Sequence, residues 1–404
     1  MFNIRNLAVL AAALVPFGAA APVETAAAPE PVIDTANKYI ITLKPGIAAP
    51  DLQSHMRWVG DVHRRNMLAR RDADPLPGVS DELSIKDFHA YVGTFDEATI
   101  EAIRNNPDVA DVEADQIYTL DAITSQSGAT WGLGSISSHN SGSTTYRYDS
   151  SAGAGGFVYV VDSGVRETHN EFGGRVVKGT NMAGGAHTDT LGHGTHVAGT
   201  AAGATYGVAK AATIVDVKVF TGRSAATSVI MSGLSWAAND IVAKGRQSRA
   251  VINMSLGGPL SNAFDAAVNS AQSSGIFVAV ASGNSNVQAV TNSPQRASGA
   301  FVVGAINSSW REASFSNYGS IVKVLAPGEG ITSAWYTSNS ATNTIDGTSM
   351  ASPHIAGLAV YLAVLEGISS PTALGNRIVA LSTTGKASGL KSGTPNRIAY
   401  NGNA

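Results

Sequence analysis

The chain of 404 residues has no cysteine, which excludes disulfide bonds, thiolate metal sites and cysteine nucleophiles. Charged side chains are also scarce, at 14% of the residues against ~25% in an average globular protein. The formal net charge of −3 gives no indication of a nucleic-acid partner. The sequence also lacks an apolar run of the ~20 residues that a membrane span requires.

Glycine, with 43 residues, and apolar side chains, at 44%, are abundant instead. This composition predicts a large folded core with many tight turns, divided into more than one domain. The charge is unevenly distributed along the chain. Residues 22–121 carry nine basic and 18 acidic side chains, a net of −9, whereas residues 122–404 carry 17 and 12, a net of +5. An acidic segment therefore precedes a basic remainder.

The first 21 residues have the pattern of a secretory signal peptide. Arg5 is followed by an apolar run from Leu7 to Val15 and by three alanines before Pro22. A buried N-terminal helix is the alternative, which the small residues at the cleavage site disfavour. We therefore expect a secreted protein. Residues 22–37, rich in Ala and Pro without periodicity, are predicted to be a linker.

Residues 38–121 are predicted to form a small α+β unit of the split βαβ type. The hydrophobic periodicity gives, in order, a strand, a helix, a strand or hairpin, a helix and an extended stretch: Lys38–Leu43, Asp51–Arg70, Ile85–Val92, Asp96–Asn105 and Val109–Leu120.

From Gly155 onward, short apolar strands alternate with helices. The strands are predicted at Phe157–Val161, Thr213–Val219, Val251–Asn253, Ile276–Val280 and Phe301–Val303, and the helices include Ser228–Lys244 and Ser261–Ser274. Strands that are almost wholly apolar indicate an α/β fold, with a mainly parallel sheet covered by helices on both faces. Ligands in such folds bind at the carboxyl ends of the strands.

Three polar residues stand at such positions, in the order Asp162, His193 and Ser349. A serine hydroxyl is a poor nucleophile at neutral pH, so acyl transfer requires a base within hydrogen-bond reach and an acid that orients that base. Asn284, just after another strand, offers an amide donor for the oxyanion. Loss of such a donor typically costs ~10²–10³ in turnover, so we expect a large but incomplete contribution from Asn284.

The motifs around these residues resemble those of the subtilisin family. They are Asp162-Ser-Gly, His193-Gly-Thr-His-Val-Ala-Gly and Gly347-Thr-Ser-Met-Ala-Ser-Pro-His. Further segments are similar to the proteinase K-like branch, and within it to the cysteine-free fungal alkaline proteases of the oryzin type: Trp131-Gly-Leu-Gly-Ser-Ile, Ile252-Asn-Met-Ser-Leu-Gly-Gly, Ala313-Ser-Phe-Ser-Asn-Tyr-Gly and Ala399-Tyr-Asn-Gly-Asn-Ala.

The resemblance implies a secreted serine endopeptidase of broad specificity, made as a self-processing zymogen. Its signal peptide would be 1–21, its ferredoxin-like inhibitor propeptide 22–121, folded about 38–121, and its subtilisin-like peptidase domain 122–404. The maturation bond would join Asp121 to Ala122. The implied partners are protein and peptide substrates and the propeptide itself, which acts as intramolecular chaperone and inhibitor. No nucleic acid, membrane or second subunit is expected.

The resemblance also implies a role for each site residue. Ser349 would be the nucleophile, His193 the general base and then acid, and Asp162 the orienting carboxylate, while Asn284 and the backbone N–H of Ser349 would hold the oxyanion. The substrate would add as a strand between two edges and place one side chain in a largely uncharged pocket. The residues involved would be Ser224, Ala225 and Ala226, then Ser255, Leu256, Gly257 and Gly258, then Ala281, Ser282 and Gly283.

No cofactor is expected for the chemistry. His196 could pair with His193 on a metal, but no Glu follows His193 as in a zincin helix, so a packed side chain is the better interpretation. The family's stronger calcium site uses an Asp where this sequence has Lys323. An ammonium cannot ligate calcium, which takes oxygen ligands, so a structural calcium is doubtful there and the metal ligands remain unknown.

The sequence contains two possible N-glycosylation sites that bear on the prediction, at Asn253 and Asn307. Asn253 lies in a predicted strand beside the site, so we expect no glycan there, whereas Asn307 is the better glycosylation candidate. Pro353 and His354 are interpreted as structural.

The sequence disfavours three other functions. An α/β-hydrolase esterase would need Gly-x-Ser-x-Gly and the order Ser, Asp, His, but Ala351 replaces the second Gly and the order is Asp, His, Ser. A binding protein on an inactive protease scaffold would be expected to lack a triad residue, and none is missing. A dinucleotide site at Gly153–Gly156 is disfavoured because these glycines precede the strand instead of following it.

Overall fold

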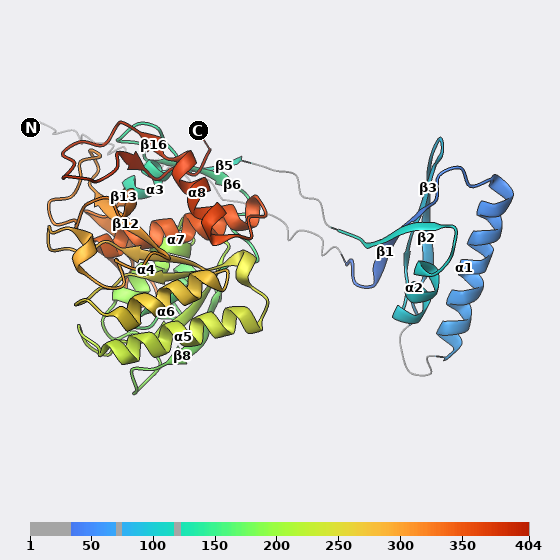
Figure 1. Ribbon diagram of the computed structural model, residues 1–404, viewed down its shortest axis with the longest axis horizontal. Helices are drawn as coiled ribbons and strands as arrows, with labels where there is room; N and C mark the ends of the chain where they lie inside the picture. Colours follow the sequence, from blue (N-terminus) through green and yellow to red (C-terminus); the bar gives the residue numbers. More distant parts are fainter. Residues whose placement is uncertain (1–33, 70–74, 117–122, 404) are drawn as a thin grey trace, which may run out of the picture. The chain divides into compact units, whose positions relative to one another are not determined.

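A computed structural model describes residues 34–69, 75–116 and 123–403. The chain divides into two compact units, Met1–Leu120 and Asp121–Ala404 (Figure 1). The predicted signal peptide and the Asp121–Ala122 bond lie outside the described residues, so the predicted maturation point remains a prediction.

The N-terminal unit is a four-stranded antiparallel sheet with two helices, in the sheet order β2-β3-β1-β4. Ile41 and Tyr91 of the sheet pack against Val59 of α1 and Ile100 of α2 in one core. Asp96 caps α2 by accepting a hydrogen bond from Thr99 N at 2.8 Å. The elements are β1 (Lys38–Leu43), α1 (Ala49–Ala69), β2 (Gly78–Ile85), β3 (Phe88–Thr94), α2 (Glu97–Arg104) and β4 (Val109–Ala114).

For the third element of this unit the sequence left a strand or a hairpin open, and the structure shows the hairpin. The range Ile85–Val92 is not one strand but contains the turn of the β2–β3 hairpin, in which Ile85 pairs with Phe88. Lys86 occupies the left-handed region with φ 52°. Because this turn has neither Gly nor Asn, the usual turn signal is absent. Strand β4 ends at Ala114, and residues 117–120 of the predicted extended stretch lie outside the described residues.

The C-terminal unit contains a nine-stranded sheet in the order β16-β17-β13-β12-β11-β10-β7-β9-β8, parallel except for the β16–β17 pair. The sheet strands are β7 (Phe157–Asp162), β8 (Val176–Asn181), β9 (Thr213–Lys218), β10 (Ala250–Met254), β11 (Phe277–Ala281), β12 (Ala300–Ile306), β13 (Val322–Pro327), β16 (Thr383–Thr384) and β17 (Arg397–Ile398). Two small antiparallel sheets pair β5 (Ile123–Ser127) with β6 (Thr145–Asp149) and β14 (Ile331–Ala334) with β15 (Thr342–Ile345).

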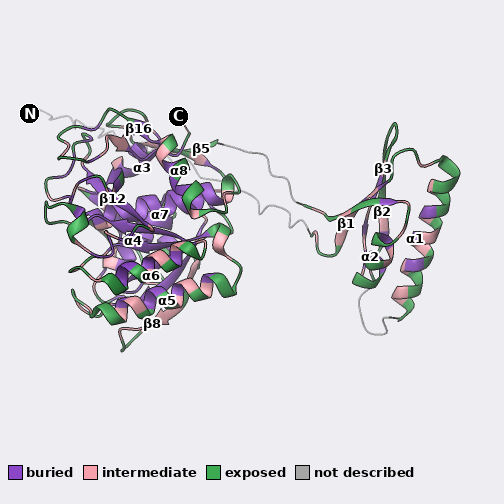
Figure 2. Ribbon diagram, in the orientation of Figure 1, coloured by how far each residue is buried: buried purple, intermediate pink, exposed green. Residues whose placement is uncertain are grey.

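Six α-helices accompany these strands in the described part of this unit: α3 (Trp131–Ile136), α4 (His193–Ala202), α5 (Thr227–Ala243), α6 (Asn262–Ser273), α7 (Thr348–Leu365) and α8 (Pro371–Leu381). Successive strand side chains point to opposite faces of the sheet. Val158 and Val160 accordingly join the core around α4 and α7, while Tyr159 and Val161 join the core beneath α5 and α6. The predicted helix-covered parallel sheet is confirmed, and its central strands β10, β11 and β12 are buried along their whole length (Figure 2).

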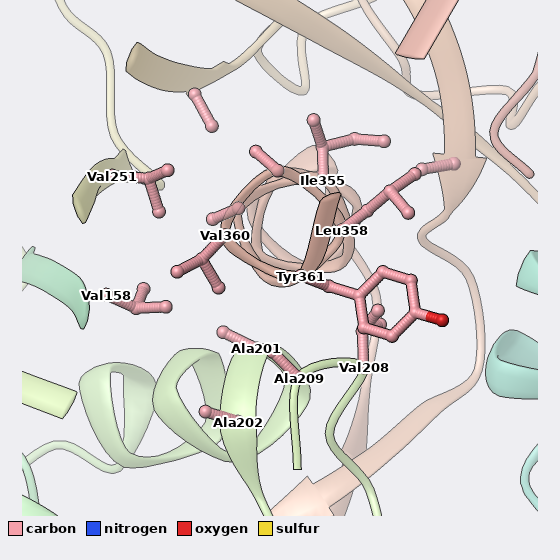
Figure 3. Close-up of a cluster of buried hydrophobic side chains, with 14 of the residues drawn as sticks. Val158, Ala201, Ala202, Val208, Ala209, Val251, Ile355, Leu358, Val360 and Tyr361 are labelled. Atoms are coloured by element: carbon pink, nitrogen blue, oxygen red, sulfur yellow. The ribbon is translucent and has the colours of Figure 1, made fainter. Parts of the chain in front are cut away.

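Helix α7 passes through the middle of one core (Figure 3). Its side chains Ile355, Leu358 and Tyr361 are fully buried, and Tyr361 Oη accepts a hydrogen bond from Asp149 N at 2.9 Å. By length and composition α7 is the one described helix that could cross a membrane, but 83% of it is buried within the protein. It is therefore a core helix of this unit.

The order of the central strands creates the site. Strand β7 lies between β9 and β10, so the loops after these two strands leave the sheet on either side of the carboxyl end of β7. A crevice opens at such a point in open α/β sheets.

Candidate active site

The carboxyl end of β7 holds a buried carboxylate bound to a histidine. Asp162 is the last residue of β7, and His193 is the first residue of α4. Asp162 Oδ1 accepts a hydrogen bond from His193 Nδ1 at 2.7 Å and another from Ser163 N at 2.7 Å. Because a carboxylate can only accept, the Nδ1 atom carries the proton, and the lone pair of the neutral ring lies on Nε2.

The environment of His193 favours the protonated ring. Burial lowers the pKa of His193, but the charge of Asp162, its hydrogen bond and the charge of Asp189 outweigh that effect, so the pKa is raised above its usual value. A base that takes a proton during a reaction benefits from such stabilisation of its imidazolium form.

Asp189 is a buried carboxylate that the sequence analysis missed. Its two oxygens accept hydrogen bonds at distances between 2.6 and 3.0 Å from Ser163 Oγ and from the start of α4, namely Leu191 N, Gly192 N, Thr195 N and Thr195 Oγ1. Ser163 Oγ in turn accepts from Gly194 N at 2.9 Å. Asp189 thus joins the segment after Asp162 to the segment that carries His193, and acts as a positioning residue.

A buried lysine supports the same segment. Lys218, at the end of β9, donates through Nζ to the carbonyls of Ser163 and Phe220. Burial lowers its pKa, and the nearby carboxylates of Asp189, Asp216 and Asp162 oppose that shift. A lone lysine in an apolar strand carries no sequence signal for this role.

Ser349 is the second residue of α7. Its Oγ donates to Ser255 O at 3.2 Å, and Ser255 Oγ donates back to Ser349 O at 2.8 Å. Among the described residues, the Ser349 hydroxyl makes no hydrogen bond to His193 Nε2. Such catalytic contacts often form only in the substrate complex. Rotation of the hydroxyl away from Ser255 O is therefore needed before it can donate to His193.

Two donors converge beside Ser349. Asn284 Oδ1 accepts from Thr348 N and Thr348 Oγ1, each at 2.8 Å, which fixes the amide so that Nδ2 is left to donate elsewhere. Gly347 has φ +153°, and a Cβ built on it would lie 3.4 Å from Asn284 Nδ2 and 3.5 Å from Ser349 N. The N–H groups of Asn284 Nδ2 and Ser349 N therefore lie next to the space that a side chain at position 347 would occupy. This arrangement suits a developing oxyanion.

We expect Asn284→Ala to lower kcat about 10²–10³-fold with little change in KM, because the donor acts mainly in the transition state. Asn284→Asp keeps an acceptor for Thr348 but removes the donor, so it should lose at least as much activity. Asn239→Ala, at an exposed position of α5, is the matched control. Steady-state kinetics on a peptide amide measure all three. Full activity of Asn284→Asp would rule out the donor role.

A cleft of about 760 Å³ extends from this site. The structure places most of the predicted substrate residues on its walls: Ser224, Ala225, Ser255, Leu256, Gly257 and Gly258. Ala226 is exposed next to them and caps α5. The side chains of Ala281 and Ser282 are buried at the end of β11, and Gly283 N donates to Thr348 Oγ1 at 3.0 Å. These last three residues therefore adjoin the start of α7, which carries Ser349.

Gln295, a second residue that the sequence analysis missed, links the two predicted pocket walls. Its buried Nε2 donates to Leu256 O at 3.0 Å and to Ala281 O at 2.6 Å. A Cβ on Gly257 would lie 2.6 Å from Gln295 Nε2, so only glycine fits there. The amide therefore holds the loops after β10 and β11 at a fixed separation.

The remaining candidate side chains have structural partners. His196 is fully buried, its Nε2 lies 3.0 Å from Ile331 O, and burial lowers its pKa to about 4. Burial likewise lowers the pKa of His354 to about 4, and its Nδ1 lies 2.8 Å from Met350 O. Pro353 lies within α7. Asn253 is buried, with hydrogen bonds to Ser255 Oγ and Ser352 Oγ, so its amide is unavailable to a glycan.

The parallel sheet, the paired Asp162 and His193, and a serine at a helix start beside two oxyanion donors together define a serine hydrolase of the α/β class. Residues 153–396 match the subtilase family, and residues 38–121 match peptidase inhibitor I9. The chain belongs to the subtilase family, and it is a subtilisin-like serine protease that is made with an inhibitor propeptide.

Relatives of known name agree over the full length. The chain is 53% identical to alkaline protease 1 of Aspergillus clavatus and 51% identical to the alkaline proteinase of Hapsidospora chrysogena, in each case over 100% of both chains. The crystal structure of a cold-adapted subtilisin-like serine proteinase matches with a TM-score of 0.63 and 41% identity over 68% of this chain and 98% of that one. The resemblance to the fungal oryzin-type branch is confirmed.

Proposed function

We propose that the mature protein is a secreted endopeptidase of broad specificity whose catalytic residues are Ser349, His193 and Asp162. The observation that carries this proposal is the 2.7 Å bond between Asp162 Oδ1 and His193 Nδ1 at the carboxyl end of β7. It leaves a neutral Nε2 as the base in a cleft open to solvent.

In this mechanism Ser349 Oγ gives its proton to His193 Nε2 and attacks the peptide carbonyl carbon. The carbonyl oxygen becomes an oxyanion, which accepts from Asn284 Nδ2 and Ser349 N. The imidazolium then protonates the leaving amine, and the acyl-enzyme forms. Water repeats the sequence, giving its proton to His193 and releasing the carboxylic acid. Asp162 keeps the ring oriented and stabilises the imidazolium throughout.

Broad specificity follows from the walls of the cleft. Ser255–Gly258 and Ser224–Ala226 offer mainly backbone groups, so an extended peptide can bind as an added strand whatever most of its side chains are. Hydrolysis of a long peptide and of a lipid ester by the processed protein tests this proposal. Peptide cleavage at many positions supports it, and ester cleavage without peptide cleavage would favour an esterase.

We also propose that maturation cuts the Asp121–Ala122 bond and that the mature enzyme works as a monomer, without a nucleic-acid or membrane partner. The I9 match ends at residue 121, which supports this position for the bond. The opposite net charges of 22–121 and 122–404 favour association of the two parts after cleavage. Asn307 is the proposed glycan site: it is half-buried in the turn after β12, and its Oδ1 accepts from Ser309 N and Arg311 N, which leaves Nδ2 free of these contacts.

A structural calcium does not fit the residues at the position suggested by the family. Lys323 is exposed on β13 and has no acidic partner among the described residues. Among the described residues there is also no cluster of three or more His, Asp or Glu side chains placed to hold a metal ion. The chemistry derived above uses side chains, the backbone N–H of Ser349 and water.

We therefore expect a chelator to leave the thermal inactivation half-life of the mature enzyme unchanged. At a free calcium concentration of 100 times the Kd, a bound calcium ion would stabilise the fold by about 2.7 kcal/mol. An inactivation assay would detect a stabilisation of this size. The assay compares EDTA with added Ca²⁺, and Lys323→Asp tests whether an oxygen ligand restores a response. A several-fold shorter half-life of the unmodified enzyme in EDTA would contradict the expectation.

A further inference from the structure

Arg223 is an unpaired cation in the wall of the cleft. Among the described residues that line the cleft, four have ionisable side chains: Asp162, His193, Arg223 and Asp346. The first two bind each other, and Asp346 Oδ1 accepts from Gly330 N at 2.6 Å. Arg223 is exposed and makes neither a hydrogen bond nor an ion pair with any described residue. Its five N–H donors are therefore available to a ligand.

The position of Arg223 relates it to the bound peptide. It lies in the loop after β9, directly before the predicted pairing segment Ser224–Ala226, and the loop 255–259 after β10 forms the opposite wall. A peptide between these walls passes beside the guanidinium. The resemblance to the subtilisin family implies that the segment Ser255–Gly258 lines the pocket for the side chain before the scissile bond. The substrate side chain that meets Arg223 on the facing wall would then belong to the same, amino-terminal part of the peptide.

The chemistry of an arginine in such a place selects an anion. A guanidinium binds a carboxylate through two parallel hydrogen bonds, with higher selectivity than a lysine ammonium. An exposed arginine elsewhere on a protein surface is well solvated, and its ion pairs contribute little. In the cleft, however, a bound peptide displaces water, which strengthens the attraction between opposite charges.

We propose that Arg223 makes this protease prefer substrates with an acidic residue on the amino-terminal side of the scissile bond. This inference rests on the proposed endopeptidase function and adds a charge preference to its broad specificity. Asp346, the other exposed charge of the cleft, would disfavour an acidic residue near its own position, so the preference is confined to the wall that carries Arg223.

The test uses pairs of peptides that differ only by Glu or Gln at each of the four positions before the cleaved bond. The ratio of kcat/KM within a pair measures the preference independently of enzyme concentration. We expect a ratio of about five at one or two positions at low ionic strength, which corresponds to about 1 kcal/mol. The ratio should fall toward one at about 1 M salt, where the screening length is about 3 Å.

Variants assign the effect to the side chain. Arg223→Gln should bring the ratio to about one, Arg223→Lys should keep part of it, and Arg223→Glu should reverse it in favour of Lys peptides. Arg249→Gln is the matched control, because it removes the same charge at another exposed position. Arg249 directly precedes the amino end of β10, at the edge of the sheet opposite the catalytic residues. It should keep the full ratio.

The possible outcomes distinguish the role of Arg223 from the endopeptidase function on which it rests. A ratio of one at every position, or a preference that Arg223→Gln leaves intact, would overturn the role of Arg223 while peptide cleavage itself continues. Failure to cleave any of the neutral Gln peptides would instead contradict the endopeptidase function. Loss of the ratio in both Arg223→Gln and Arg249→Gln would assign the preference to net charge and not to the cleft.

Discussion

Ser349→Ala should accumulate as an uncleaved precursor and lose about 10⁶-fold in kcat, the size of loss known for removal of the nucleophile from the triad of another subtilisin-like protease. The Ser349 hydroxyl oxygen is the atom that forms the acyl-enzyme in the proposed mechanism, and Asn284 Nδ2 and Ser349 N are the donors beside it. The same substitution blocks self-processing if the chain cuts its own propeptide. Denaturing gels and mass spectrometry of the secreted product measure the precursor.

Two comparisons make this prediction specific. Ser235→Ala, at an exposed position of α5, should mature normally and keep full activity. Addition of a trace of mature enzyme to the Ser349→Ala precursor should release the propeptide, which would show that the precursor is folded and cleavable. Normal maturation of Ser349→Ala expressed alone would show that another protease performs the cut.

Asp162→Asn should lower kcat about 10⁴-fold, because an amide permits the wrong tautomer of His193 and cannot stabilise its imidazolium. Asp162 also raises the pKa of His193. His193 must be neutral to act as the base, so activity falls as the pH drops through that pKa. With Asn at position 162 the pKa falls, and the acid limb of kcat/KM should move to lower pH.

The pH profile distinguishes this role from a merely structural one. Loss of rate without a shift of the acid limb would indicate that Asp162 supports the fold and does not act through His193. Asp240→Asn is a suitable control, since Asp240 lies on α5, binds Tyr159 of β7 and Lys244, and has no part in the site. It should leave both the rate and the acid limb unchanged.

Much of the fold could be predicted because its elements carry strong local signals. The strands of the central sheet are buried on both faces, so their sequences are continuous apolar runs such as Phe157–Val161 and Ile276–Val280. Asp96 and Ser261 cap their helices as their residue types predict. Site residues could be found for a related reason, because the carboxyl ends of parallel strands meet at one edge and collect polar groups from distant parts of the chain.

Other parts could not be predicted, since they depend on neighbours that are remote in sequence. Asp189 and Gln295 are ordinary polar residues until the fold surrounds them with backbone donors and acceptors. The β2–β3 hairpin turns at Lys86 without the glycine that marks such turns. Ser349 Oγ donates to Ser255 O and not to His193. This choice of partner also depends on the tertiary structure, because the three residues are far apart in the sequence. Only the structure shows that Arg223 has no hydrogen-bond or ion-pair partner among the described residues.

The most direct measurement of the central claim is covalent labelling of the processed protein with a serine-directed phosphonate, followed by peptide mapping. A phosphonate reacts with a serine only where a base and oxyanion donors activate it. We expect one modified residue, Ser349, with loss of peptide hydrolysis in proportion to labelling and no labelling of Asp162→Asn on the same time scale. Modification of any other residue, or full hydrolysis after complete labelling of Ser349, would contradict the assignment.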